Sequence, residues 1–134
     1  MTKLTTIVRL TPAQQLWVDA LRSGEYSQTT ETLQDTNGYC CLGVACQVAK
    51  NQGIKVHITA HSGLISGGEL SDQRAVWNWL GLRNSTGYTD QWELTHLNDE
   101  CCYTFPQLAD FIEEHAAQLF IQKENLNETN HIQR

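Results

Sequence analysis

The chain has 134 residues, of which 40% are hydrophobic and 18% charged, a composition typical of one globular domain and not of a disordered chain. Fifteen acidic and nine basic residues give a net charge of −6, which disfavours duplex nucleic acid as a partner because phosphates repel an acidic surface. No apolar run approaches the roughly 18 residues of a membrane span, and residues 1–10 lack the features of a secretion signal, so we expect a cytoplasmic protein without membrane contact.

The first predicted helix begins at Thr11-Pro12, because threonine is a favoured helix cap and proline is favoured in the first turn. Apolar residues then recur at helical spacing and predict a face turned to the core, made up of Ala13, Leu16, Trp17, Ala20 and Leu21. Ser23-Gly24 predicts its end. Residues 27–34 alternate weakly and predict a strand, and the turn signal at residues 35–38 predicts a tight hairpin.

The segment Cys40–Lys50 is apolar on almost every side and predicts a buried central helix, which Gly53 ends. Residues 54–58 alternate between apolar and polar and predict a half-exposed strand. A glycine-containing loop over residues 60–69 follows. Ser71 predicts the start of another helix, which carries two tryptophans and ends at Gly81.

Residues 92–97 alternate and predict a further strand. Thr104-Phe105-Pro106-Gln107 has the spacing of a capping box and predicts a last amphipathic helix. We therefore predict an α+β fold, with a small, mainly antiparallel sheet packed against about four helices and one buried central helix near residues 40–50. Residues 1–122 should form a single globular domain, and the polar residues 123–134 a frayed tail.

Five cysteines are present, four of them in adjacent pairs: Cys40, Cys41, Cys46, Cys101 and Cys102. An odd number with adjacent pairs fits a disulfide framework poorly, so we expect reduced thiols. Structural zinc sites usually pair cysteines two to four residues apart, whereas these are adjacent or separated by four residues, even if His57 and His61 supplied ligands. We predict no metal site and no cofactor.

A cysteine nucleophile is one possible chemistry. Cys40 or Cys41 would lie at a helix N-terminus, where the helix dipole lowers the pKa of a thiol. His96 and Asn98 follow in the order Cys, His, Asn found in papain-like hydrolases. The opposing interpretation is that these cysteines are packing residues among apolar neighbours. We favour packing, and lean towards a protein that is not an enzyme.

A pocket for a small anionic or nucleotide ligand is the second possibility, because arginine can clamp a phosphate and an aromatic ring can stack on a base. The candidate residues follow the first helix, flank the tryptophan-bearing helix or lie in the turn after residue 97: Arg22, Tyr26, Gln28, Arg74, Trp77, Asn98 and Asp99. The alternative is that Arg22 pairs with Glu25 or Asp99 and that the aromatic residues belong to the core.

Three segments of the chain recur together in other sequences. They are Leu16–Gln28, then Tyr39-Cys40-Cys41-Leu42-Gly43-Val44-Ala45-Cys46, and finally Leu97-Asn98-Asp99 with the helix from Phe105. In this respect the chain resembles a family of small, largely uncharacterised proteins encoded by phages and prophages, over most of residues 16–114. Cys101-Cys102 departs from the family pattern, which more often has glycine and small polar residues there. The resemblance implies a phage-related origin and an accessory role in the host cytoplasm.

The leading hypothesis is a phage or prophage accessory protein of the counter-defence type. It would sequester a small nucleotide-like signal molecule without catalysis, as a homo-oligomer. This hypothesis depends on the resemblance, which is an analogy. Two alternatives stay open, namely the Cys-His-Asn hydrolase and an acidic inhibitor that binds a host defence protein.

Overall fold

The structure is a computed structural model that describes residues 9–122. Within these residues the elements are as follows: α1 (Pro12–Arg22), β1 (Gln34–Asp35), β2 (Gly38–Tyr39), α2 (Cys41–Asn51), the 3-10 helix η1 (Leu70–Asp72), α3 (Arg74–Leu80), α4 (Leu94–Asp99), α5 (Phe105–Glu114) and α6 (Ala116–Leu119). The predicted α+β class is confirmed, with one two-stranded antiparallel sheet. The tail predicted for residues 123–134 lies outside the described residues.

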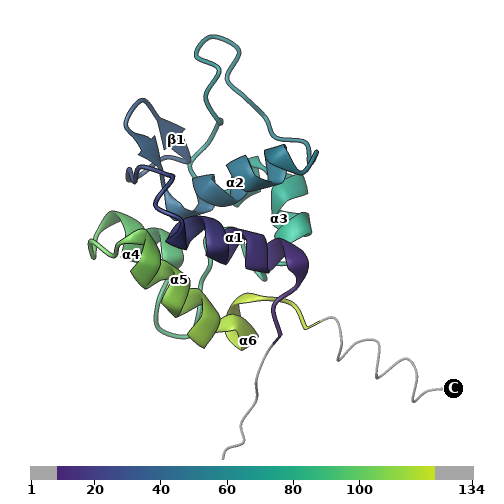
Figure 1. Cartoon of the computed structure of the whole chain (residues 1–134), viewed down its shortest axis with the longest axis vertical. Helices are drawn as coiled ribbons and strands as arrows, with labels where there is room; N and C mark the ends of the chain where they lie inside the picture. The colour runs from purple at the N-terminus through teal and green to yellow at the C-terminus, as the bar shows by residue number, and fades with distance from the viewer. Residues whose placement is uncertain (1–8, 123–134) are drawn as a thin grey trace, which may run out of the picture.

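Helix α2 occupies the centre of the molecule, with α1 and α3 packed against it (Figure 1). Eight of its eleven residues are buried, which confirms the predicted central helix. The fully buried Trp17 on α1 donates its indole N–H to the Cys41 carbonyl oxygen at 2.9 Å, and its ring meets Phe120 edge-on. Helix α5 packs on the other side of α1. The core therefore runs from α2 through α1 to α5.

The predicted threonine caps are both present, and the capping box predicted at Thr104 is matched by a second one at Thr11. The Thr11 hydroxyl accepts a hydrogen bond from Gln14 N–H, and the Gln14 amide oxygen accepts one from Thr11 N–H. Thr104 and Gln107 form the same pair of bonds at α5. The buried face of α1 differs from the prediction, since Leu16 is 39% exposed while Gln14 is buried. The Gln14 amide explains this, because it donates to the Leu80 carbonyl oxygen at 2.8 Å and so ties α1 to α3.

The sheet is smaller than predicted. Residues 27–34 do not form a continuous strand, because most of their pairing is with Tyr39 alone: Thr29 N–H donates to Tyr39 O and Tyr39 N–H to Ser27 O. The hairpin itself is confirmed at Gln34–Asp35 and Gly38–Tyr39, and the Asp35 carboxylate accepts hydrogen bonds from the turn amides of Asn37 and Gly38.

Residues 92–97 are not a strand. They lead into α4, whose residues Leu94, Leu97 and Asn98 are buried at helical spacing. The alternating pattern over residues 92–97 was ambiguous because positions 94 and 97, three residues apart, share one face of a helix.

Residues 54–58 are also not a regular strand, but a single bridge joins Ile58 to Ile65. We call residues 54–66 the projecting loop, since they extend away from the helices at the top of Figure 1. The projecting loop is held at its base by Gln73, whose side chain is fully buried. Its amide oxygen accepts His57 N–H at 2.8 Å, and its amide nitrogen donates to the carbonyl oxygens of His57 and Ser66. One side chain therefore fixes both arms of the loop.

Candidate functional site

Three of the predicted ligand-binding residues, Gln28, Asn98 and Asp99, do lie together. Asn98 is only 2% exposed. Its amide oxygen accepts hydrogen bonds from the Gln28 side chain at 2.9 Å and from Cys41 N–H at 3.2 Å, and its amide nitrogen donates to Thr29 O and to Asp99. We call this the Asn98 network. Because both ends of the Asn98 amide are occupied within the protein, the network joins α4 to α2 and to the segment before β1.

Arg22 does not face that network. Its guanidinium binds Glu113 through two hydrogen bonds of 2.8 and 2.9 Å and also contacts Asp110, so the ion pair crosses from α1 to α5. These hydrogen bonds lower the pKa of the Glu113 carboxyl. The pairing differs from the Glu25 or Asp99 partner considered from the sequence, and two carboxylates already compensate the charge of Arg22. Tyr26 lies elsewhere, edge-on to the Tyr39 ring at 5.3 Å.

Arg74 and Trp77 lie together on α3. The guanidinium carbon of Arg74 is 5.6 Å from the centre of the Trp77 ring, a cation–π contact. The Trp77 indole N–H donates to the Leu82 carbonyl oxygen. Trp77 therefore closes the turn after α3, and its ring already carries a cation on the exposed side.

The cysteines of the central segment are packing residues. Cys40, Cys41 and Cys46, hereafter the buried cysteines, are at most 3% exposed. Burial raises the pKa of the Cys40 thiol to about 11 and raises the pKa of the other two as well. Cys40 does cap α2, because its sulfur accepts Gly43 N–H at 3.4 Å. Desolvation of the thiolate outweighs the effect of the helix N-terminus here.

The proposed Cys-His-Asn arrangement is not assembled. His96 is exposed on α4, and in the described part of the chain no hydrogen bond joins its ring to either thiol. Asn98 binds the backbone amide of Cys41 and not the His96 ring. His57, His61 and the second cysteine pair, Cys101 and Cys102, are exposed, and residues 9–122 contain no group of three metal-ligating side chains.

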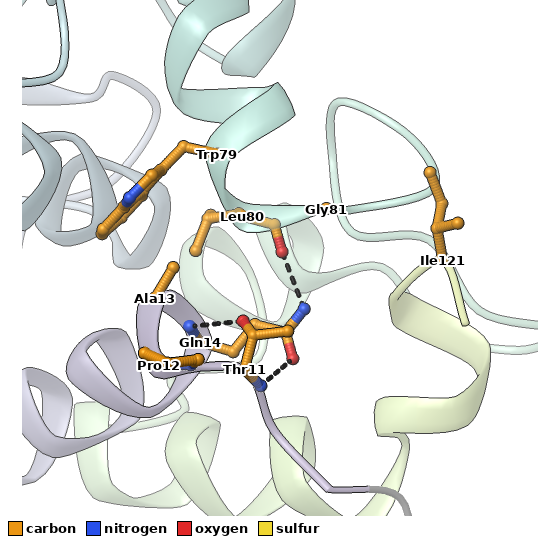
Figure 2. A pocket seen from close by; sticks show the side chains of 8 residues that line it. All are labelled: Thr11, Pro12, Ala13, Gln14, Trp79, Leu80, Gly81 and Ile121. Atoms are coloured by element: carbon orange, nitrogen blue, oxygen red, sulfur yellow. Dashed lines mark hydrogen bonds between the residues drawn. The ribbon is translucent and has the colours of Figure 1, made fainter. Parts of the chain in front are cut away.

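A small pocket lies where α1 begins and α3 ends (Figure 2). Figure 2 shows Trp79 and Ile121 on opposite sides, with the Thr11–Gln14 cap and the Gln14–Leu80 hydrogen bond between them. Its volume is about 140 Å³. The Thr11 hydroxyl and the Gln14 amide that line it are occupied by hydrogen bonds within the protein, so it offers an apolar depression with few groups to orient a ligand.

A second hollow, of about 210 Å³, lies between the turn after Gly87 and the start of α6. We call it the Trp92 hollow, and it is lined by Thr89, Asp90, Gln91, Trp92, His115 and Gln118. The turn is closed by Thr89 N–H donating to Trp92 O at 2.6 Å. The Gln118 amide oxygen accepts Asp90 N–H at 3.2 Å, and the His115 ring stacks on Phe111. Trp92 is 45% exposed.

None of the residues that line this hollow is among the ligand-binding residues predicted from the sequence. The predicted strand over residues 92–97 obscured the turn that places Trp92 beside α6. The spacing of Thr89 and Trp92, which are the ends of a four-residue turn, was the signal that could have revealed it.

Within residues 9–122, no helix has the length and apolar character needed to cross a membrane. A family model described as a domain of unknown function, DUF8296, matches residues 11–116. Neither a curated protein nor a solved structure matches the chain significantly. The family match covers both capping boxes, the central helix and the Asn98 network, and the chain belongs to the DUF8296 family.

Proposed function

We propose that this protein is an accessory binding protein of the phage or prophage type, which sequesters a small nucleotide-like molecule without catalysis. The observation that carries the proposal is the Trp92 hollow, where an exposed indole lies beside side chains able to donate and accept hydrogen bonds. The phage-related origin depends on the sequence resemblance and not on the fold.

The lining of the hollow matches a planar heteroaromatic ring. Stacking of a base on an aromatic side chain contributes about 1–3 kcal/mol. Since the Gln118 amide oxygen is bonded to Asp90 N–H, the amide NH₂ of Gln118 is the part left to donate to a ligand. The Asp90 carboxylate can only accept. The hollow thus presents a donor, an acceptor and a stacking surface, which together suit the edge and face of a nucleobase.

The phosphate of such a ligand would lie outside the hollow, whose described lining includes no lysine or arginine. Arg83 is the cation on this side, because its guanidinium is 3.4 Å from the Ala117 carbonyl oxygen, next to Gln118 in the chain. A ligand held by its base, with its phosphate exposed to solvent, would be bound without reaction at the phosphate. The raised pKa of the buried cysteines supports the same conclusion, since none of them is a ready nucleophile.

The test is calorimetric titration of the protein with a panel of nucleoside mono-, di- and cyclic phosphates. Trp92→Ala should weaken binding by about 5- to 150-fold, the equivalent of losing one stacking contact. Tyr88→Ala is the matched control, because Tyr88 is an exposed aromatic residue outside the lining, and it should bind as the wild type does. Failure of every nucleotide to bind, or equal losses in both variants, would rule the proposal out.

A further inference from the structure

The charges of the chain are separated along its sequence. From Thr36 to Gly68 there is no aspartate or glutamate, whereas from Asn84 to Gln122 there are seven and no lysine or arginine. The exposed lysines and histidines of the first segment, together with the neighbouring Arg74, form what we call the basic pole: Lys50, Lys55, His57, His61 and Arg74. The carboxylates of the second segment form the acidic pole: Asp90, Glu93, Asp99, Glu100, Asp110, Glu113 and Glu114.

The fold keeps these two poles apart. The projecting loop extends from the top of the molecule in Figure 1, whereas α4, α5 and α6 lie along its left side and bottom. Arg22 compensates part of the acidic pole through Asp110 and Glu113, and the other five carboxylates form no ion pair within residues 9–122. A molecule with opposite charges at opposite ends presents complementary surfaces to another copy of itself.

The acidic residues nearest to the basic pole in the chain accept hydrogen bonds within the protein, with Asp72 exposed and Glu69 half-buried. Asp72 accepts a hydrogen bond from Gly68 N–H at 3.1 Å, and Glu69 accepts one from the Ser85 hydroxyl at 2.6 Å. The lysines and Arg74 form no ion pair with the described residues, so their charge is available to an external partner.

The projecting loop is already ordered in the single chain, because the buried Gln73 fixes both of its arms. A segment that is already ordered loses less conformational entropy on binding. A rigid, basic projection at one end and a broad acidic face at the other are the two halves of a head-to-tail contact. A second copy of the chain is the partner that satisfies both at once.

We propose that the protein self-associates head to tail, with the basic pole of one copy seated on the acidic pole of the next. Such a contact uses two different surfaces, so it produces rings or open chains and not two-fold dimers. It should be reversible and sensitive to salt, as expected for contacts between exposed charges. The net charge of −6 opposes association at long range, so the local complementarity must exceed that repulsion.

The experiment is sedimentation equilibrium of the full chain over a wide concentration range, at low and at high salt. The wild type should exceed the 15.2 kDa monomer at low salt and return to it at high salt. Lys55→Glu should weaken association at least tenfold. Arg9→Glu changes the net charge equally at an exposed position outside both poles, and should associate nearly as the wild type does.

Mixing two variants gives the decisive result. Lys55→Glu disables the basic pole but leaves the acidic pole intact, and Glu100→Lys/Glu114→Lys does the reverse. Each variant alone should be monomeric, while their equimolar mixture contains one intact contact and should form dimers and nothing larger. A wild type that stays monomeric at low salt, a mixture that fails to dimerise, or association that strengthens with salt would overturn the proposal. None of these results depends on whether a nucleotide binds.

Discussion

Replacing Gly43 with alanine tests why a glycine lies in the middle of the buried helix α2. In an ordinary helix this change is stabilising by about 1 kcal/mol, because alanine has the higher helix propensity. Here a Cβ atom built on Gly43 would lie 1.8 Å from the Leu33 carbonyl oxygen, whereas close carbon–oxygen contacts in proteins lie at about 3.3–3.6 Å. The helix and the residue 33 backbone would have to separate by roughly 1.5 Å.

That separation has a cost that can be worked out from the contacts. The Leu33 carbonyl oxygen also accepts Cys40 N–H at 3.2 Å, so a shift weakens a hydrogen bond that contributes about 1 kcal/mol. The fully buried Leu33 side chain would lose part of its packing, and overpacking of a core typically costs about 1–3 kcal/mol. After the gain of about 1 kcal/mol in helix propensity, we expect Gly43→Ala to lower the free energy of unfolding by about 1–3 kcal/mol.

The assay is urea denaturation followed by tryptophan fluorescence, with a thermal melt beside it. At this chain length the expected loss corresponds to a fall in Tm of roughly 4–12 °C. Gly68→Ala is the matched control, because the nearest atom to its Cβ is the Glu31 carbonyl oxygen at 3.8 Å, and its stability should change by less than about 0.5 kcal/mol. A Gly43→Ala protein as stable as the wild type would refute the close approach of the two backbones.

Three further outcomes are expected. Asn98→Ala should destabilise the protein by about 2–4 kcal/mol in urea melts, because it leaves buried partners such as Cys41 N–H without an acceptor, while the exposed Asn78→Ala should change little; equal effects would contradict the Asn98 network. Iodoacetamide should label the exposed Cys101 and Cys102 in the folded protein and the buried cysteines only after denaturation, as peptide mass spectrometry can show; rapid labelling of Cys40 would restore the nucleophile hypothesis. Arg22 lowers the pKa of Glu113, so the ion pair contributes stability above the ordinary carboxyl pKa of 4.5, and this stability is lost as the pH falls through the lowered pKa. The small difference in unfolding free energy between wild type and Arg22→Ala should therefore shrink in acid. A difference that grows in acid would be inconsistent with the ion pair.

The helix ends and the central helix could be predicted because their signals are local. Thr11-Pro12 and Thr104 specify caps through neighbours three residues away, and an unbroken apolar run specifies burial whatever the partners are. The strand assignments failed where the deciding contact is distant in sequence. Trp92 and Leu94 fit the strand period, whereas Leu94 and Leu97 fit the helix period, and the packing of α4 beside α2 and α5 selects the helix.

The candidate site was harder to predict, because residue type does not reveal how much of a side chain is already used. Arg22 was predicted to bind an anionic ligand, but the fold places beside it two carboxylates that lie about 90 residues away in the chain. Asn98 was predicted as a ligand-binding residue, but both ends of its amide form hydrogen bonds within the protein. Trp92 is a candidate because the fold places it in the same hollow as Gln118, and no local sequence pattern connects these two residues.

The Asn98 network also has a consequence for synthesis of the chain on a ribosome. The acceptor of the Cys41 N–H hydrogen bond lies 57 residues later in the chain, and α1 packs against α5 across about 90 residues. Helices α1 and α2 therefore leave the ribosome with exposed apolar surface, and they cannot complete their packing until α4 and α5 have also emerged from the exit tunnel. Contacts of such long range slow folding, so a nascent chain truncated before residue 98 should be a target for chaperones and proteases. Residues 9–122 should fold in one cooperative step once α5 and α6 have been synthesised.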